Sequence, residues 1–141
     1  MAHEAKLNVE GKKYNLIECT YELVRPADPA SAQLRGGVQC GKISFTVVSP
    51  PDNDMFFHEW IEKSNAAKDG QIDIKVVDLG SITDRTLYFK HAFCTRIYES
   101  FYMHMDKQMY TMIDIIAAEV AFGGDDNKVT ITNDLKKAMA N

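Results

Sequence analysis

The chain has 141 residues, the size of one domain, and carries 16 Lys and Arg against 20 Asp and Glu, for a net charge of −4. This acidic balance argues against nucleic acid as the main partner. The three cysteines, Cys19, Cys40 and Cys94, lie far apart and lack CxxC spacing, which argues against a disulfide framework or a zinc ribbon. We therefore expect a single domain over residues 1–141 with reduced thiols.

The N-terminal segment MAHEAKLNVEG has no apolar core of signal-peptide length. No stretch approaches the roughly 18 consecutive apolar residues of a membrane span. We therefore expect a protein that is made in the cytoplasm and leaves it only through a dedicated export machine.

Apolar and polar residues alternate in two segments on either side of Gly11. Their apolar positions are Ala5, Leu7, Val9, Ile17, Cys19, Tyr21 and Leu23. A period of two is typical of strands with one buried face, so the pattern predicts a β-hairpin. The next residues, RPADPASAQLRGG from Arg25 to Gly37, have two prolines and no periodicity. This pattern predicts a long irregular loop, and such loops in compact domains are usually functional or mobile.

The strand pattern resumes from Val38 to Ser49, but with a change of phase. Val38 and Cys40 are out of phase with the apolar positions that begin at Ile43. We predict a β-bulge at Gly41, between the two phases.

The stretch Met55 to Gly70 is the one segment with helical periodicity. Its apolar face consists of Phe56, Phe57, Trp60, Ile61 and Ser64. Asp52, Asn53 and Asp54 are candidate N-cap residues, and Gly70 is a candidate C-cap. We expect Phe56, Phe57, Trp60 and Ile61 to anchor this helix on flanking β structure and to seal one end of the core.

Four further strands follow the helix. We place them from Ile72 to Val76, Leu87 to Tyr98, Met109 to Phe122 and Val129 to Thr132. Ser100 to Gln108 is a Met-rich connection, and residues 133–141 are expected to form a flexible tail.

Two of these late strands are apolar on both faces. Met109 to Phe122 offers Met112 and Ile116 on one side and Ile113 and Ile115 on the other. A sheet that meets water on one side normally alternates cleanly, so a second cover is needed. We infer that neighbouring copies of the chain supply it.

Chemical motifs are weak throughout. His58, Glu59 and Glu62 resemble a zincin helix, but a glutamate stands where the second histidine is required. A Met-rich packing loop is preferred to a copper site as the interpretation of Met103, His104, Met105, Met109 and Met112. Asp125, Asp126 and Asn127 fit a hairpin turn better than a calcium loop. No GxSxG or glycine-rich phosphate loop is present, so we predict no catalytic, cofactor or metal site.

The ordered set of segments resembles a known family. It runs from IECTYELVR and GGVQCGKISFTVVS through the Trp60 helix and DGQIDIKVVD to RTLYFKHAFCTRIYESF and MYTMIDIIAAEVAF. Over about Ala5 to Thr132 this order resembles the tube protein of type VI secretion systems, the haemolysin-coregulated protein family, and in particular its branch in Bacteroidetes.

The resemblance implies a mainly β fold, a two-sheet antiparallel β-barrel or sandwich with one helix at its side. It also implies hexameric rings that stack into a hollow tube, with a contractile sheath, a spike protein and effector proteins as partners. The helix would lie toward the outside. The loop between early strands would reach the next ring, with the residues Arg25, Pro26, Asp28, Pro29, Ser31, Gln33 and Arg35.

Two alternatives remain open at this stage. One is the tail-tube subunit of another contractile injection device, because such tubes share the fold. The other is a barrel that binds an apolar ligand inside, with the helix as a lid. An enzyme has little support from the residues.

Overall fold

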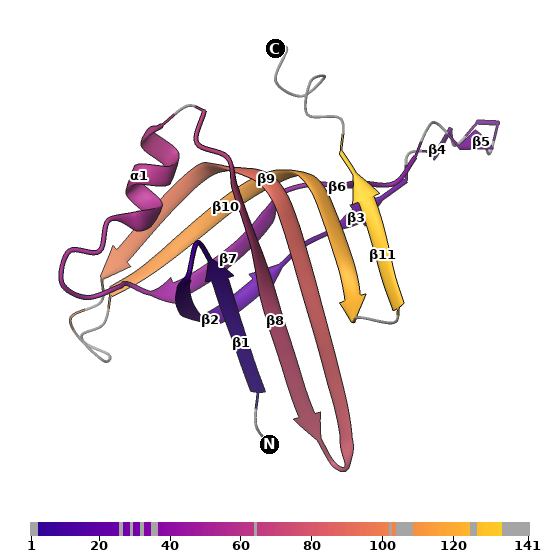
Figure 1. Ribbon diagram of the computed structural model, residues 1–141. Coiled ribbons are helices and arrows are strands. Elements are labelled where there is room, and N and C mark those ends of the chain that lie inside the picture. The colour runs from indigo at the N-terminus through magenta and orange to yellow at the C-terminus, as the bar shows by residue number, and fades with distance from the viewer. Residues whose placement is uncertain are drawn as a thin grey trace.

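The fold is seen in a computed structural model that describes residues 3–25, 27–28, 30–31, 33–34, 37–63, 65–101, 103, 109–124 and 127–133 (Figure 1). The elements in chain order are β1 (His3–Val9), β2 (Lys12–Thr20), β3 (Leu23–Val24), β4 (Ala27–Asp28), β5 (Gln33–Leu34), β6 (Gln39–Cys40), β7 (Ile43–Val48), α1 (Phe56–Glu62), β8 (Lys68–Asp78), β9 (Ser81–Phe101), β10 (Met109–Gly124) and β11 (Asn127–Thr132).

The main sheet closes on itself. Its order is β11-β10-β7-β2-β1-β8-β9, and β9 pairs again with β10, so six antiparallel strands form a barrel with β11 on the outside edge of β10. Closure removes most free strand edges and directs alternate side chains into a common core. The expected mainly β barrel with one helix at its side is confirmed.

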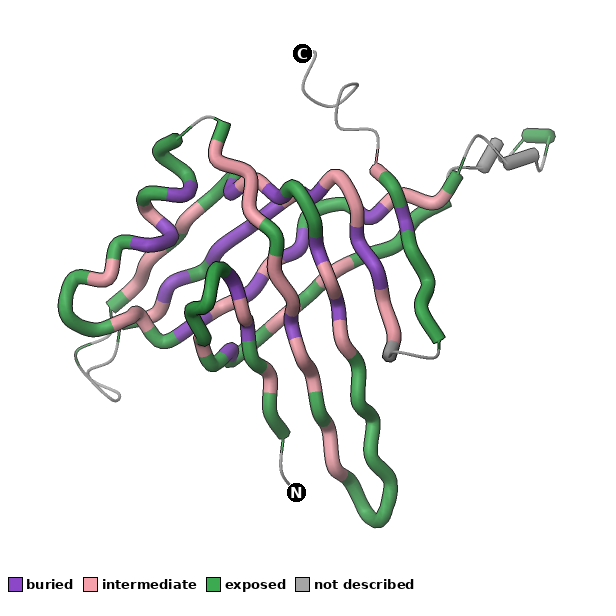
Figure 2. Tube along the Cα trace, in the orientation of Figure 1, coloured by how far each residue is buried: buried purple, intermediate pink, exposed green. Residues whose placement is uncertain are grey.

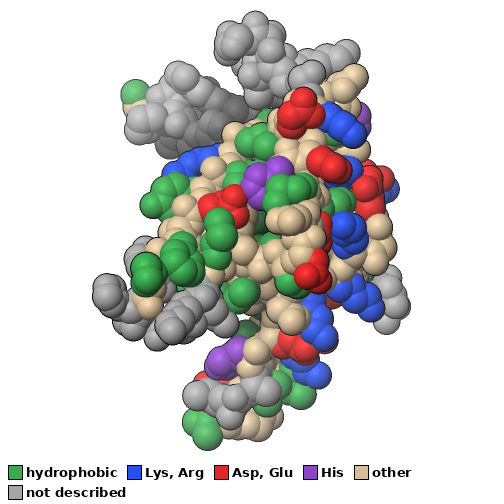
Figure 3. Space-filling view, turned by 90° about the vertical axis from the view of Figure 1, so that its left-hand side faces the viewer, with side chains coloured by type: hydrophobic (Ala, Val, Ile, Leu, Met, Phe, Trp, Pro, Cys, Tyr) green, Lys and Arg blue, Asp and Glu red, His purple; other side chains and the backbone are tan. Residues whose placement is uncertain are grey.

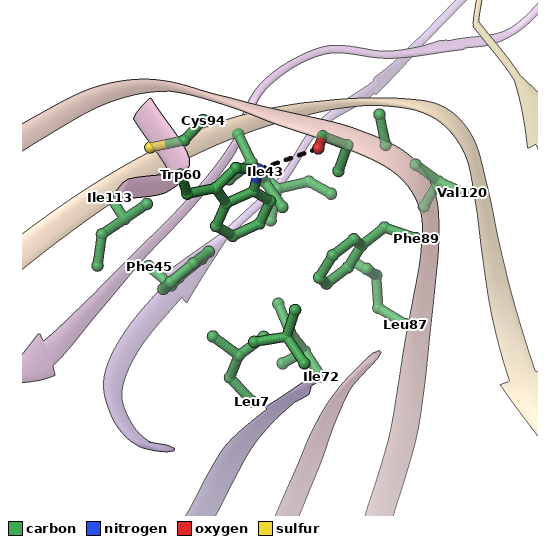
Figure 4. Close-up of a cluster of buried hydrophobic side chains, with 14 of the residues drawn as sticks. Leu7, Ile43, Phe45, Trp60, Ile72, Leu87, Phe89, Cys94, Ile113 and Val120 are labelled. Atoms are coloured by element: carbon green, nitrogen blue, oxygen red, sulfur yellow. Dashed lines mark hydrogen bonds between the residues drawn. The ribbon is translucent and has the colours of Figure 1, made fainter. Parts of the chain in front are cut away.

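The core occupies the middle of the barrel, where buried segments of all the main strands meet (Figure 2). Its largest fully buried side chains include Phe45, Ile72, Phe89 and Ile113. Figure 4 shows these side chains pointing toward one another from different strands. The interior is therefore filled by side chains, which argues against an apolar ligand inside the barrel.

The predicted N-terminal hairpin is present, but its second strand has a different phase. Leu16 is buried, whereas Ile17 is 56% exposed. The register with β7 shifts between Leu16 and Glu18, which marks a bulge with one extra residue on β2. Because side chains alternate with period two, this extra residue turns Ile17 outward and returns Cys19 to the packed side.

The predicted phase change at Gly41 is also present, in another form. Cys40 and Ile43 are both buried, and the chain between them belongs to neither β6 nor β7. The Gly41 amide donates to the Glu22 carbonyl at 3.3 Å. In place of the expected bulge, the chain leaves β6 after Cys40 and enters β7 at Ile43.

Strands β9 and β10 are long because they bend together and serve both sides of the barrel (Figure 1). Phe89 and Ala92 are both buried on β9, and their register partners Val120 and Ala117 are both buried on β10. Buried residues three apart require a change of phase, and His91 with φ 54° lies within it.

Helix α1 is shorter than predicted. It ends at Glu62, and Lys63 is already extended with φ −87° and ψ 113°. Gly70 is not its C-cap but part of β8. A Cβ on Gly70 would lie 2.6 Å from the Phe89 ring and 2.7 Å from the Asn8 carbonyl, so glycine is needed there for close strand packing.

Three of the four predicted helix anchors are buried. Phe56, Phe57 and Trp60 are 8%, 1% and 1% exposed, respectively. The assignment of Ile61 is wrong, because its side chain is 37% exposed. With a helix of only 7 residues, the face that meets the barrel is too short and narrow to include it.

Trp60 connects α1 to the bend in β9. Its indole N–H donates to the Ala92 carbonyl at 3.1 Å, and its ring lies 6.4 Å from that of Phe89 in a stacked arrangement (Figure 4). The neighbouring amide of His91 donates to a carboxylate oxygen of Asp69 at 2.8 Å. Side chains therefore satisfy backbone groups at the bend.

We predict that Trp60→Ala lowers the free energy of unfolding by about 3–5 kcal/mol, because it leaves a cavity and an unpaired carbonyl. Trp60→Phe keeps an aromatic ring and should cost about 1–3 kcal/mol. Urea denaturation measures both values. Ile61→Ala is the control, and a loss for it as large as that of Trp60→Ala would contradict this account.

Asp54 organises the chain before α1. Its carboxylate accepts hydrogen bonds from Lys12 at 3.1 Å, Tyr14 at 3.0 Å and the Phe56 amide at 3.1 Å. Burial favours a higher pKa, but the hydrogen bonds from Lys12, Phe56 and Tyr14 outweigh it, so the pKa of Asp54 lies below its ordinary value of 3.8. Asp54 is thus the residue among the three predicted caps that binds a helix amide.

A carboxylate with a lowered pKa stabilises the fold above its ordinary pKa, and this contribution is lost as the pH falls through the folded-state pKa. We predict that Asp54→Asn has a lower melting temperature than the wild type at neutral pH. The difference in melting temperature between Asp54→Asn and the wild type should disappear below the ordinary pKa of 3.8. Melting curves from about pH 7 to about pH 2.5 test this, and a gap that stays constant would contradict it.

Candidate functional site

The predicted stacking loop forms an arm that projects from the barrel (Figure 1). At its base β3 pairs with β6, and further out β4 pairs with β5, so that Asp28 lies opposite Gln33. The β4–β5 pair forms a sheet of its own. The loop predicted as irregular therefore contains one short antiparallel ladder, β4–β5, and a second ladder, β3–β6, flanks it.

The structure places only some of the predicted arm residues. Arg25 and Ser31 are exposed. Asp28 and Gln33 are placed by their backbone pairing alone. Pro26, Pro29 and Arg35 lie outside the described residues, and so do residues 134–141 of the predicted tail.

A second surface lies on the outside of β7, β10 and β9. Paired residues form three rows across these strands, namely Val48, Tyr110 and Ser100; Thr46, Met112 and Tyr98; and Ser44, Asp114 and Arg96. We call these nine positions the outer apolar face after its apolar members, Val48, Tyr110, Met112 and Tyr98; the other five are polar or charged. Val48, Met112 and Tyr98 are 44%, 38% and 49% exposed. The second apolar side predicted for the late strands thus meets solvent in the single chain.

The outer apolar face contains one buried charge. Asp114 is only 7% exposed and accepts a hydrogen bond from the Ser44 hydroxyl at 2.7 Å. Lys42 and Arg96 lie 3.8 and 3.9 Å from its carboxylate, and Arg96 also stands over the Tyr98 ring at 5.6 Å. These contacts hold the Arg96 side chain between Asp114 of β10 and the Tyr98 ring of its own strand, β9.

The opposite side of the barrel is polar. Asp73 on β8 accepts hydrogen bonds from Asn8, Gln71 and Thr86 at 3.0–3.2 Å. Figure 3 shows acidic and basic side chains gathered along its right-hand edge and exposed hydrophobic side chains to their left. The two sides of the barrel therefore differ in chemistry.

His58 belongs to a hydrogen-bonded chain that fastens α1 to the barrel. Its Nε2 lies 2.7 Å from Oε1 of Glu99, and the buried Thr111 hydroxyl donates to Oε2 of Glu99 at 3.0 Å. Ser49 lies 2.7 Å from Thr111. Glu59 and Glu62 are exposed and take no part, so these residues do not converge as metal ligands.

No group of three or more His, Cys, Asp or Glu side chains that could hold a metal is found among the described residues. Four of the residues weighed as a copper or calcium site, His104, Met105, Asp125 and Asp126, lie outside them. Burial raises the pKa of the Cys19 and Cys94 thiols to about 11. Such thiols stay protonated at neutral pH and are poor nucleophiles.

The structure also places exposed apolar residues that the sequence pattern did not single out. Val48, Leu79 and Ile82 are 44%, 99% and 63% exposed. A strand pattern predicts which residues share a face, but it does not say which face has a neighbour. In the described part of the chain, no helix is long and apolar enough to span a membrane.

The comparisons with known proteins agree on one family. A family model described as hemolysin coregulated protein Hcp (TssD) matches residues 1–129. No curated protein sequence matches the chain.

Solved structures of this kind share the fold. Hcp1 from Flavobacterium johnsoniae is 24% identical, with a TM-score of 0.71, over 92% of this chain and 99% of that one. Hcp3 from Pseudomonas aeruginosa is 10% identical, with a TM-score of 0.67, over 94% and 99%. Hcp1 from Salmonella typhimurium is 8% identical, with a TM-score of 0.68, over 96% and 97%. Flavobacterium belongs to the Bacteroidetes, the branch that the sequence resembles.

Proposed function

Because the chain belongs to the haemolysin-coregulated protein (TssD) family of type VI secretion tube proteins, we propose that it assembles into hexameric rings that stack into the hollow inner tube. Residues 1–141 would form one tube-protein domain. Effector proteins would be delivered through or with this tube. The contractile sheath and the spike protein would be its partners in the machine.

The outer apolar face carries this proposal. The barrel is closed and its interior is filled, so Met112, Tyr98 and Val48 have no role in its own core. Exposed apolar side chains that lie next to one another on a regular sheet are typical of surfaces that pack against another chain. A neighbouring copy within the ring would remove them from water.

The proposal gives the protein a structural role without catalysis. The thiols are buried or half-buried, and His58 is engaged with Glu99, so neither offers a catalytic constellation among the described residues. The chain would remain in the cytoplasm before firing and would then be exported by the type VI machine. No cofactor or nucleic acid is needed for this role.

The arm from Arg25 to Gly37 is the proposed stacking element. Its outer pair, β4 and β5, is built only from its own two strands, which leaves the projecting end available to a chain in the next ring. The helix face of Phe56, Phe57 and Trp60 serves the barrel itself, and α1 would lie toward the outside of the tube.

We predict that Met112→Glu prevents ring formation, because it places a charge in the centre of an interface that must be desolvated. Analytical ultracentrifugation and negative-stain microscopy measure the effect, with at least a tenfold loss of assembled protein expected. Asn15→Glu, which adds the same charge at an exposed position of β2, is the matched control. Rings formed equally by both variants would contradict the assignment of this face.

A second prediction concerns the arm. Replacing residues 26–33 by a short Gly/Ser linker should leave single rings intact but shorten or abolish stacks, because the linker cannot reproduce the β4–β5 pairing. Electron microscopy distinguishes single rings from stacks. Unchanged stacks would contradict the stacking role of the arm.

A further inference from the structure

The β8–β9 hairpin extends beyond the barrel. The pairing of β1 with β8 ends at Val76, and the pairing of β10 with β9 begins at Leu87. Val77 and Asp78 pair only with Ile82 and Ser81 of the same hairpin. Figure 1 shows this hairpin projecting from the end of the barrel that is remote from α1.

The end of this hairpin carries apolar side chains that lie outside the hydrophobic core of the described residues. Leu79, at the turn, is 99% exposed, and Ile82 is 63% exposed. Val77 lies directly opposite Ile82. We call Val77, Leu79 and Ile82 the hairpin tip.

Leu79 is also a poor residue for its backbone conformation. Leu79 and Gly80 have φ values of 41° and 84°, and a two-residue hairpin turn with both φ angles positive is of type I′. Asn, Asp and Gly are preferred at the first of these positions, whereas a left-handed leucine is disfavoured. The fold gains neither burial nor a good turn from Leu79, which indicates a role outside the single chain.

The same fold contains a matched turn. Glu10 and Gly11 join β1 to β2 with φ values of 48° and 78°. There the first position holds a polar side chain, which accepts a hydrogen bond from Lys68 at 3.0 Å. The two turns share one backbone conformation, and only Leu79 presents an apolar side chain.

A groove of about 230 Å³ lies at the base of the arm. It offers an apolar surface of the kind that Leu79 does not contact within its own chain. Tyr21, Val24, Gly41 and Lys42 line it, together with Thr20, Glu22 and Ser44. Val24 is 45% exposed, and the side chain of Lys42 is 65% exposed. The groove thus combines the apolar surfaces of Tyr21 and Val24 with two opposite charges, those of Glu22 and the accessible Lys42.

The charge next to the hairpin tip is complementary to this cation. Asp78 precedes Leu79 and is exposed. The nearest carboxylate to Lys42 in the described residues is that of Asp114, at the long distance of 3.8 Å. A contact that inserted Leu79 beside Val24 could therefore bring Asp78 to Lys42 and would desolvate both apolar surfaces.

We propose that the hairpin tip of one copy inserts Leu79 into the arm-base groove of a second copy. This inference rests on the proposed function, because it names a contact between copies of a self-assembling chain. The two surfaces are different parts of the molecule, so the contact is head-to-tail and can be repeated by every copy. It assigns the β8–β9 hairpin a role in assembly beside the outer apolar face and the arm.

The variant Leu79→Asn distinguishes a role of Leu79 in assembly from a role of Leu79 in folding. Asn suits a type I′ turn, so this variant should raise the melting temperature of the dissociated chain by roughly 2–4 °C. It should also raise the dissociation constant of the assembly at least tenfold. Glu10→Asn is the matched control, which makes the same change of turn residue and should leave assembly unchanged.

Sedimentation over a dilution series measures both variants against the wild type. Weaker assembly for Leu79→Asn alone supports the proposal. Equal assembly of Leu79→Asn and wild type overturns the hairpin contact but leaves the proposed function standing, and so does equal weakening by both variants. A wild type that never assembles overturns the proposed function itself.

Cross-linking tests the groove. One preparation carries Leu79→Cys and a second, mass-labelled preparation carries Val24→Cys, and the two are mixed and treated with a short bismaleimide. Burial holds the pKa of Cys19 and Cys94 at about 11, so these native thiols react slowly at neutral pH. A mixed dimer that carries one label supports the proposal. The groove assignment is overturned if this dimer is absent and a preparation with Ser31→Cys in place of Val24→Cys gives an equal or better yield of cross-linked dimer.

Discussion

The hydrogen bond from the Trp60 indole to the Ala92 carbonyl fixes the place where the barrel turns. Strands β9 and β10 change phase together at this point, with Ala92 paired to Ala117 and Phe89 to Val120. A bend in a strand removes backbone groups from the regular ladder, and such groups are costly to bury unpaired. The helix supplies the missing donor and stacks on Phe89, so one side chain joins helix, bend and core.

The bend determines which surfaces remain for other chains. Because β9 and β10 cross between the two sides, six strands close without help from a second copy. The side chains left outside take no part in this closure. They are polar around Asp73 and apolar around Met112 and Tyr98. Family membership and this surface point in the same direction, since a tube subunit must be a stable barrel with faces reserved for its neighbours.

Hydrophobic periodicity predicted most of the elements, and it failed where the phase changes. The period of two places Ile17 on the buried side, because no pattern shows the extra residue on β2 that turns it outward. A glycine after an amphipathic segment resembles a C-cap and so predicts a helix that reaches Gly70, whereas Gly70 is required by the close approach of Phe89. The prediction that Ile61 is buried is wrong for the same reason, because the helix ends at Glu62. The sequence pattern does not mark Leu79 as a functional residue, because only its backbone conformation and its exposure make it unusual.

In the proposed assembly, a self-sufficient barrel uses its outer apolar face to meet its neighbours in a ring. A cryo-electron microscopy reconstruction of the purified, assembled protein tests this most directly, because it shows which side chains lie between copies. We expect six-membered rings in which Met112 and Tyr98 are covered by the adjacent copy. Rings in which these two side chains face solvent, or a protein that remains a monomer at high concentration, would contradict it.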